Sequence, residues 1–178
     1  MTIHLPKLSS LHLFLIRAVV LYLLWQTTYI FWLKPAGHLD IWLTESVAVS
    51  SVYLLQLFGY DAYGVKNQVF LNQIPAVWIG HACNGLSLMV LFLGFIGSSP
   101  GKIISKVSYG LIGVLLIYAS NALRVMILAI NYVKSPLTFD FNHKYTYAIA
   151  VYLIIFCMWM IWTNYFSGVK INQQATTV

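Results

Sequence analysis

Three side chains of this sequence have the chemistry that thiol catalysis requires. Cys83 begins an apolar run, Arg124 lies inside another, and His143 comes just before the last. A thiolate forms readily beside a cation, an imidazolium or a helix N-terminus. An imidazole can accept and return a proton, and a guanidinium can hold a developing oxyanion. Cys83, His143 and Arg124 are therefore candidates for a nucleophile, a proton carrier and an oxyanion partner.

The elements that must position these residues are predicted to be membrane-spanning helices. Of the 178 residues, 60% are hydrophobic and 8% are charged, and the mean hydropathy is +0.80, outside the usual balance of a soluble domain. A span needs about 20 mostly apolar residues. We place five spans near residues 11–33, 41–58, 84–98, 107–133 and 144–166. The expected fold class is all-α, a polytopic transmembrane helix bundle of about five spans that forms a single domain over residues 1–178.

Two segments fall outside these spans. Residues 59–80 contain glycines, a proline, charges and alternating apolar positions. This pattern predicts a short extended or hairpin-like loop at the membrane interface, directly before Cys83. Residues 167–178 are predicted to be a polar tail. The first apolar run is too long for a signal-peptide core and no small-residue cleavage site follows it, so we expect a retained span.

The charge of the chain does not indicate a nucleic-acid partner. The formal net charge is +6 and the isoelectric point is near 9.3, but no basic run with interleaved aromatic residues is present. Almost every lysine lies at the end of a predicted span, where basic side chains meet anionic lipid headgroups. Membrane lipid is therefore the expected partner of these charges. The lysines divide almost evenly between the two faces, so they do not determine the orientation.

The order of the spans predicts that the three candidate residues converge. If successive spans alternate in direction, Cys83, Arg124 and His143 all lie toward one membrane face. Arg124 is about nine residues, or about 14 Å, from the end of its span, and its long side chain can reach back toward that end. A guanidinium inside the membrane costs on the order of 3 kcal/mol, so it normally faces a protein interior or a polar cavity. By the same argument, Glu45 falls at the opposite end of its span from Cys83.

Cys83 has polar neighbours along the chain. Asn84 and Gly85 place small groups directly after the thiol, at the predicted start of a helix. His81 lies two residues before Cys83, and in an extended segment their side chains point the same way. His81 therefore competes with His143 for the role of base.

Other polar residues accompany the two basic side chains. Asn121 shares a helix face with Arg124 and either binds it or bridges two helices. Asp140 flanks His143, and it either orients the imidazole or, like Asn142, caps the last helix. Arg124 also has a structural interpretation, in which its guanidinium satisfies backbone carbonyl groups or snorkels toward the membrane interface.

The second cysteine is expected to be inert. Cys157 lies in the middle of the last apolar run, where a cysteine packs as a small buried hydrophobe. It is predicted to lie about 21 Å deeper than His143, which is beyond disulfide reach of Cys83. Cys83 is therefore expected to be a free thiol.

At three motifs the sequence resembles the exosortase/archaeosortase family of integral membrane enzymes. The motifs are ACNGL at residues 82–86, NALR at 121–124 and FNHKY at 141–145. Their order and topology are similar to those of the short, single-domain bacterial members. The resemblance implies a cysteine peptidase and transpeptidase in which Cys83 is the nucleophile, Arg124 activates it or stabilises charge, and His143 shuttles the proton. No cofactor and no metal are expected.

The same resemblance implies the partners and the location of the protein. The expected substrates are exported proteins with a C-terminal sorting tail, made of a short motif, a hydrophobic span and a basic cluster. The acyl group then passes to an acceptor, which the sequence does not identify. The implied location is the bacterial inner membrane, with the site on the extracytoplasmic side. Two positions depart from the family pattern, since Asn84 stands where Ser is common and Tyr147 or Ala148 where a glycine is often found.

Two functions of other classes stay open at this point. His81, Cys83, His143 and Asp140 are acceptable ligand types for copper or zinc. The other alternative is a non-enzymatic membrane module, in which Arg124 holds an anionic lipid or a partner helix. The substitution Cys83→Ser would be harmless in such a module, whereas in a thiol enzyme it would abolish processing.

Overall fold

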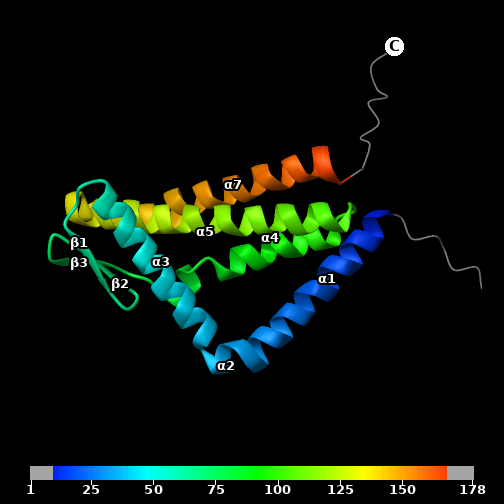
Figure 1. The fold of residues 1–178 in the computed structure, drawn as a ribbon, viewed down its shortest axis with the longest axis horizontal. Helices are drawn as coiled ribbons and strands as arrows, with labels where there is room; N and C mark the ends of the chain where they lie inside the picture. Colours follow the sequence, from blue (N-terminus) through cyan, green and yellow to red (C-terminus); the bar gives the residue numbers. More distant parts are fainter. Residues whose placement is uncertain (1–9, 168–178) are drawn as a thin grey trace, which may run out of the picture.

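The computed structural model of the chain describes residues 10–167, so most of the predicted polar tail lies outside the described residues. Helices make up most of the fold, with one small sheet (Figure 1). The strands are β1 (Ala62–Val65), β2 (Gln68–Leu71) and β3 (Ile74–Trp78). The helical elements are α1 (Ser10–Thr28), η1 (Tyr29–Leu33), α2 (Lys34–Ala36), α3 (His38–Leu57), η2 (His81–Cys83), α4 (Leu86–Ser98), α5 (Ile103–Lys134), η3 (Pro136–Thr138), α6 (Phe139–Phe141), η4 (Asn142–Thr146), α7 (Tyr147–Ile161) and η5 (Trp162–Phe166).

Three helical stretches among residues 10–167 are long and apolar enough to cross a membrane: Leu11–Ala36, Ile103–Lys134 and Pro136–Phe166. The prediction of a multi-span membrane protein is confirmed. The predicted number of five spans is confirmed only in part, since three stretches are long and apolar enough. With 13 residues, α4 is about 20 Å long, shorter than the hydrocarbon core of about 30 Å. α3 is not among the three because Asp40, Glu45 and several hydroxyl side chains interrupt its apolar residues.

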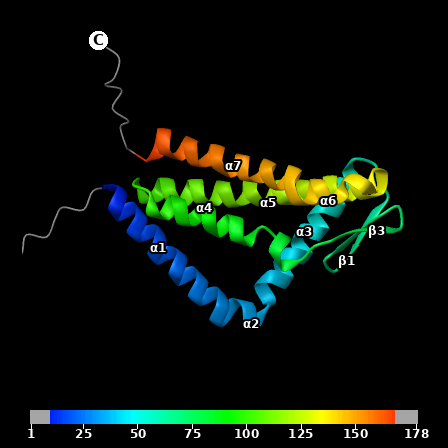
Figure 2. The same ribbon diagram turned by 180° about the vertical axis from the view of Figure 1, so that it is seen from behind.

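α5 forms the centre of the molecule. Its 32 residues extend over about 48 Å, with α4 and α7 beside it and antiparallel to it (Figure 1, Figure 2). A Cβ atom at Gly113 would overlap the ring of Phe92, so the missing side chain is what lets α4 approach. Phe92 is fully buried in the apolar core that α4, α5 and α7 share. A second core lies between α3, the sheet and the later half of α5.

α1, α2 and α3 form a V with α2 at its apex (Figure 1, Figure 2). The chain turns at Gly37, whose φ of 68° lies in the left-handed region that favours glycine. The predicted break at this point is confirmed, although the helix continues to Ala36 and not only to residue 33. In the most apolar window of Leu11–Ala36 no residue is buried, so α1 lies at the edge of the bundle.

Residues 62–78 form an antiparallel sheet with strand order β1-β2-β3, which corrects the all-α class to a helical bundle with one small sheet. The prediction of an extended, hairpin-like segment over 59–80 is confirmed. Asn72 and Gln73 both have positive φ, as a two-residue hairpin turn requires. Pro75 lies on β3, an edge strand, where a missing N–H is tolerated. The buried residues of the sheet pack against α3 and α5.

The last helical stretch starts earlier than predicted. It begins at Pro136, because a proline in the first turn of a helix loses no hydrogen bond, and η3, α6, η4, α7 and η5 follow one another to Phe166. His143 therefore lies inside this stretch, about two turns from its start. Neither Asp140 nor Asn142 makes a capping hydrogen bond, so the prediction that they cap this helix is wrong.

Candidate functional site

The segment from Gly80 to Gly85, called here the Cys83 turn, connects the sheet to α4. Gly80 is extended, residues 81–83 form one 3₁₀ turn, and Gly85 has a φ of 85°. α4 begins only at Leu86, so Cys83 precedes the helix and does not open it. The side chain of Cys83 is half-buried and is a free thiol, as predicted.

Cys83 and His143 face each other across the site. The distance from Cys83 Sγ to His143 Nε2 is 3.9 Å, although 60 residues separate the two in the chain. The imidazole stacks on the ring of Phe139, with centroids 5.9 Å apart and an interplanar angle of 8°, and this stack limits its rotation. A distance of 3.9 Å is long for proton transfer, but such pairs often tighten when a substrate binds. The geometry is that of a thiol beside an imidazole.

Arg124 adds an unpaired cation to this pair. Its charge acts on the imidazole of His143, as do the charges of Asp140 and Lys144. Its Nε is buried without a hydrogen-bond partner, and Arg124 forms no hydrogen bond or salt bridge within the described part of the chain. The structural interpretation, in which Arg124 satisfies carbonyl groups, is therefore not seen there. An unpaired guanidinium is able to bind an anion that enters the site.

Asn121 joins α5 to the Cys83 turn. Its Nδ2 donates to the carbonyl oxygen of Cys83 at 2.9 Å, and Asn121 is 1% exposed. Gly85 permits this approach, because a Cβ at that position would lie 3.4 Å from Nδ2. Of the two interpretations of Asn121, the bridge between elements is observed and a bond to Arg124 is not. The Oδ1 atom of Asn121 is buried without a partner.

Asn84 joins the same turn to α3. Its Nδ2 donates to Oδ1 of Asp40 at 2.8 Å, and its Oδ1 accepts the backbone N–H of Leu86 at 2.9 Å. The other carboxylate oxygen of Asp40 accepts the hydroxyl of Tyr29 at 3.0 Å. Asp40 and Asn84 are both almost fully buried.

The sequence interpretation missed Asp40. It assumed that the start of α3 lies at the opposite end of the bundle from Cys83, and the hydrogen bond between Asp40 and Asn84 shows this to be wrong. The sheet folds back along α3 before the chain reaches Cys83 (Figure 2), so the direction of the spans does not alternate there. The available signal was Asp40 itself, an acidic residue directly before the predicted span 41–58.

Two other candidates lie at the margin of the site. His81 is exposed, and no hydrogen bond of its side chain is found in residues 10–167. It belongs to a 3₁₀ turn, where side chains two positions apart point in different directions, so the extended geometry assumed for His81 and Cys83 is wrong. Asp140 is also exposed and acts on His143 only through its charge. Asn142 donates to Oδ1 of Asn131 at 3.3 Å and does not contact the imidazole.

Neither a metal centre nor a second buried thiol is found near this pair. Within the described residues, no group of three or more His, Cys, Asp or Glu side chains could hold a metal ion, so the copper or zinc alternative has no ligand set there. Cys157 is exposed on α7, which corrects the prediction that it is buried.

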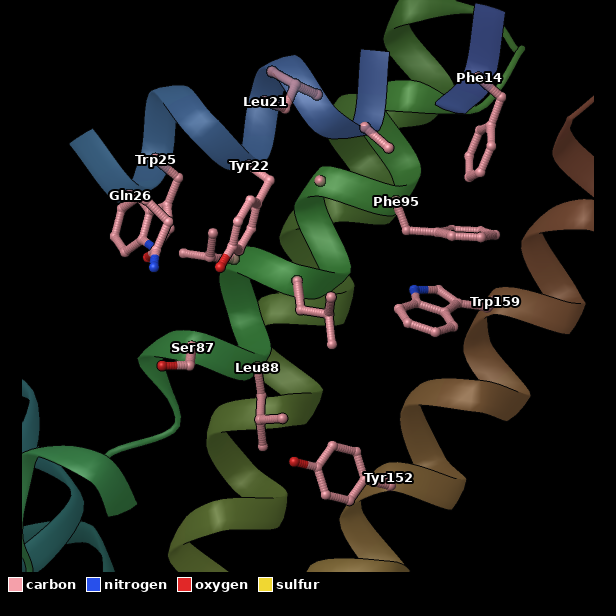
Figure 3. A pocket seen from close by; sticks show the side chains of 14 residues that line it. Phe14, Leu21, Tyr22, Trp25, Gln26, Ser87, Leu88, Phe95, Tyr152 and Trp159 are labelled. Carbon is pink, nitrogen blue, oxygen red and sulfur yellow. The ribbon is translucent and has the colours of Figure 1, made fainter. Parts of the chain in front are cut away.

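An apolar groove begins close to the Cys83 turn. Its volume is about 440 Å³, and it lies between α1, α4 and α7. Figure 3 shows Ser87 and Leu88 on α4 at one end and Phe14 of α1 at the other. The indole Nε1 of Trp159, in the wall of the groove, is buried without a partner. The lining residues are Phe14, Ala18, Leu21, Tyr22, Trp25, Gln26, Ser87, Leu88, Val90, Leu91, Gly94, Phe95, Tyr152 and Trp159.

The fold and the site define a polytopic membrane protein in which a thiol lies 3.9 Å from an imidazole, and the charge of Arg124 acts on that imidazole. A family model described as Transmembrane exosortase (Exosortase_EpsH) matches residues 9–162. The chain therefore belongs to the transmembrane exosortase family. No curated protein and no solved structure matches the chain.

Proposed function

We propose that this exosortase is a cysteine peptidase and transpeptidase that acts within the membrane. The observation that carries the proposal is the 3.9 Å distance between Cys83 Sγ and His143 Nε2, with the unpaired guanidinium of Arg124 acting on the same imidazole. A thiol beside an imidazole is the arrangement of a nucleophile and its base. In this proposal Cys83 is the nucleophile, His143 the base and acid, and Arg124 the oxyanion partner.

The reaction follows from these roles. His143 Nε2 takes the proton of the thiol, and Sγ attacks the carbonyl carbon of the scissile peptide bond. The carbonyl oxygen becomes an oxyanion, which the guanidinium of Arg124 stabilises. The C–N bond then breaks, the leaving amine receives the proton from His143, and a thioester to Cys83 remains. An acceptor nucleophile gives its proton to His143 and attacks the thioester, and the thiol is regenerated.

The substrate in this proposal is an exported protein with a C-terminal sorting tail. The groove between α1, α4 and α7 supports this proposal, because its apolar lining suits a hydrophobic span and its α4 end lies at Ser87, two residues after the Cys83 turn. A span in this groove would place the residues that precede it beside Cys83. Membrane lipid would cover the exposed apolar side of α1.

The proposed location is the bacterial inner membrane, with the Cys83 turn toward the extracytoplasmic side. The three apolar stretches that are long enough to span support a membrane location. The orientation follows from the substrate, because an exported protein presents its sorting motif on the outer side. Reaction of Cys83 in intact cells with a thiol reagent that does not cross the inner membrane tests it, and protection of Cys83 from that reagent would contradict it.

The test of the proposed function is a trapping experiment with the full chain in its own membrane. Cells that express the wild type, Cys83→Ser or His143→Ala are compared by intact-mass analysis of the purified enzyme. We expect a thioester adduct on Cys83 in the wild type that hydroxylamine removes, and processed C-termini of exported proteins in the same cells. Full processing by Cys83→Ser would overturn the proposal and favour the membrane module in which Arg124 holds an anionic lipid or a partner helix.

A further inference from the structure

A buried carboxylate lies beside the Cys83 turn and is not part of the reaction proposed above. Asp40 is 4% exposed and lies in the first turn of α3. A buried carboxylate is unfavourable unless hydrogen bonds compensate for the lost water. Both of its oxygens have such a partner, since Oδ1 accepts from Asn84 and Oδ2 from Tyr29. Asp40 thus connects the apex of the V to the turn that carries the thiol.

The partners of Asn84 determine which way its amide points. The Nδ2 group donates to the Asp40 carboxylate, and the Oδ1 atom accepts from the backbone N–H of Leu86. The reversed amide would place a donor against the N–H of Leu86 and an oxygen against a carboxylate. Asn84 is also 1% exposed. It is therefore held as a rigid bridge from α3 to the first turn of α4.

This bridge restrains the backbone that follows Cys83. Two further hydrogen bonds restrain the peptide groups of Cys83 itself, one from α5 and one within the turn. The carbonyl of Cys83 accepts from Asn121 at 2.9 Å, and its N–H donates to the carbonyl of Gly80 at 2.8 Å. The direction of a Cα–Cβ bond follows from the backbone on either side of it. The distance from Sγ to His143 thus depends on the bridge between Asp40 and Asn84.

We propose that Asp40 is a positioning residue that acts through Asn84 to aim the thiol of Cys83 at His143. This inference rests on the proposed function, in which Cys83 is the nucleophile. A serine at position 84 would not replace the bridge, because its one hydroxyl cannot both donate to Asp40 and accept from the N–H of Leu86 across the same span.

The test measures alkylation of Cys83 by iodoacetamide across pH, on the full chain in detergent micelles. Glutathione in the same micelle solution serves as the reference thiol, because Cys157 lies within the membrane-spanning stretch Pro136–Phe166 and is covered by detergent. We expect Asp40→Leu to slow alkylation of Cys83 at neutral pH by about tenfold, the size of effect expected from loss of a hydrogen bond to a charged group. Its pH profile should move toward that of glutathione. Equal profiles for the wild type and Asp40→Leu would overturn the inference.

A double-mutant cycle separates action through Asn84 from a general structural effect. In the background of Asn84→Ser the bridge is already absent, so Asp40→Leu should have no additional effect on the alkylation of Cys83. A further loss of similar size in that background would overturn the inference, because Asp40 would then act by another route.

If Asp40→Leu does not fold, the side chains of Asp40 and Asn84 can instead be exchanged with each other. Asn84→Asp sets two carboxylates against each other and should slow the alkylation of Cys83. Adding Asp40→Asn to that chain restores one donor and one acceptor with the same shapes, and the rate should return to within about twofold of the wild type. Failure of this rescue in a folded protein would contradict the inference.

The outcomes of these tests are distinct from those of the proposed function. If Cys83→Ser still processes substrates, the proposed function fails, whereas the effect of Asp40 on Cys83 alkylation can still be observed. If Cys83→Ser abolishes processing but the alkylation profile of Asp40→Leu equals that of the wild type, the proposed function stands and the inference about Asp40 fails.

Discussion

The Cys83 turn and the apolar groove are neighbours on α4, but they are built in opposite ways. Two polar groups of the turn are bonded from two helices, since Asp40 holds the buried side chain of Asn84 and Asn121 holds the carbonyl of Cys83. The groove has apolar and aromatic walls, and one of its walls is α1, whose most apolar window has no buried residue. The difference indicates a rigid site for chemistry beside an open surface for binding.

This difference has a physical reason. A nucleophile must be held within a fraction of an ångström of its base, and this requires side chains locked by packing and hydrogen bonds. A hydrophobic span that enters from the lipid needs only apolar contact, which is non-directional. Separate substitutions should therefore impair chemistry and substrate binding independently.

The largest effect is expected from removing His143, the proposed base beside the Cys83 turn. His143→Ala should lower the rate of substrate cleavage by about 10²–10⁴, the usual contribution of general acid–base catalysis. The measurement is the appearance of the processed C-terminus of an exported protein, by mass spectrometry over time. Cys157→Ala is the control, because that thiol is exposed on α7, and it should cleave like the wild type. A loss below about threefold in His143→Ala would contradict the role of His143.

Arg124→Lys should give the next largest loss, about 10²–10³ in cleavage rate, similar to loss of an oxyanion donor. The ammonium group keeps the charge but lacks the planar fork of the guanidinium and sits on a shorter side chain. The same cleavage assay measures it. Arg17→Lys on the exposed side of α1 is the matched control. Equal losses in both variants would show that the effect does not arise at the site.

Gly94→Leu should separate binding from chemistry. Gly94 lines the groove, and a Cβ placed there has no neighbouring atom within 4 Å, so a side chain added there extends into the groove. Cleavage should fall about tenfold or more, because contacts of one large apolar side chain are worth about 1.5–3 kcal/mol. The alkylation rate of Cys83 should not change. Leu115→Phe, at a residue 67% exposed on α5, is the control for added bulk.

If Gly94→Leu lowers both the cleavage rate and the alkylation rate of Cys83, the groove and the Cys83 turn are not independent. Such a result would mean that they form one coupled unit, and that filling the groove displaces the thiol. A fall in cleavage alone supports two independent parts.

The smallest effect is expected where the two regions meet. Tyr29→Phe removes the hydroxyl that donates to Asp40 and leaves the bond from Asn84 in place. We expect a few-fold slower alkylation of Cys83, in line with about 0.5–1.5 kcal/mol for one hydrogen bond. Tyr53→Phe, at a residue 67% exposed on α3, is the matched control. A loss in Tyr29→Phe as large as that of Asp40→Leu would mean that Tyr29, and not Asn84, is the partner through which Asp40 acts.

The directions of α4, α5 and α7 alternate, and this explains why the site could be predicted from the sequence. The spans predicted at 84–98, 107–133 and 144–166 overlap these helices, which run antiparallel as expected (Figure 1). Because the short breaks between them leave little choice of direction, the start of one and the end of the next lie together. Cys83 is therefore expected at the same end as His143, and the structure brings the two side chains to 3.9 Å from each other.

The alternation of direction does not extend to α3, because the segment after α3 is a folded sheet. The sheet returns along α3 and packs its buried face against α3 and α5. The chain therefore reaches Cys83 near the beginning of α3, where Asp40 lies. No periodicity within residues 59–80 reveals where a sheet packs, since strand patterns indicate extended structure but not its neighbours.

The sequence by itself determined the membrane class, the main helices and the motifs that place the chain in its family, because apolar run length and residue type depend on local chemistry alone. The tertiary structure alone decided that Asp40 and Asn121 hold the Cys83 turn, that His81 stands apart, and that Arg124 has no partner among the described residues. These facts depend on contacts between residues that are 38 or more positions apart or on a turn shape. Such contacts arise only when several elements pack together, and no local pattern records them.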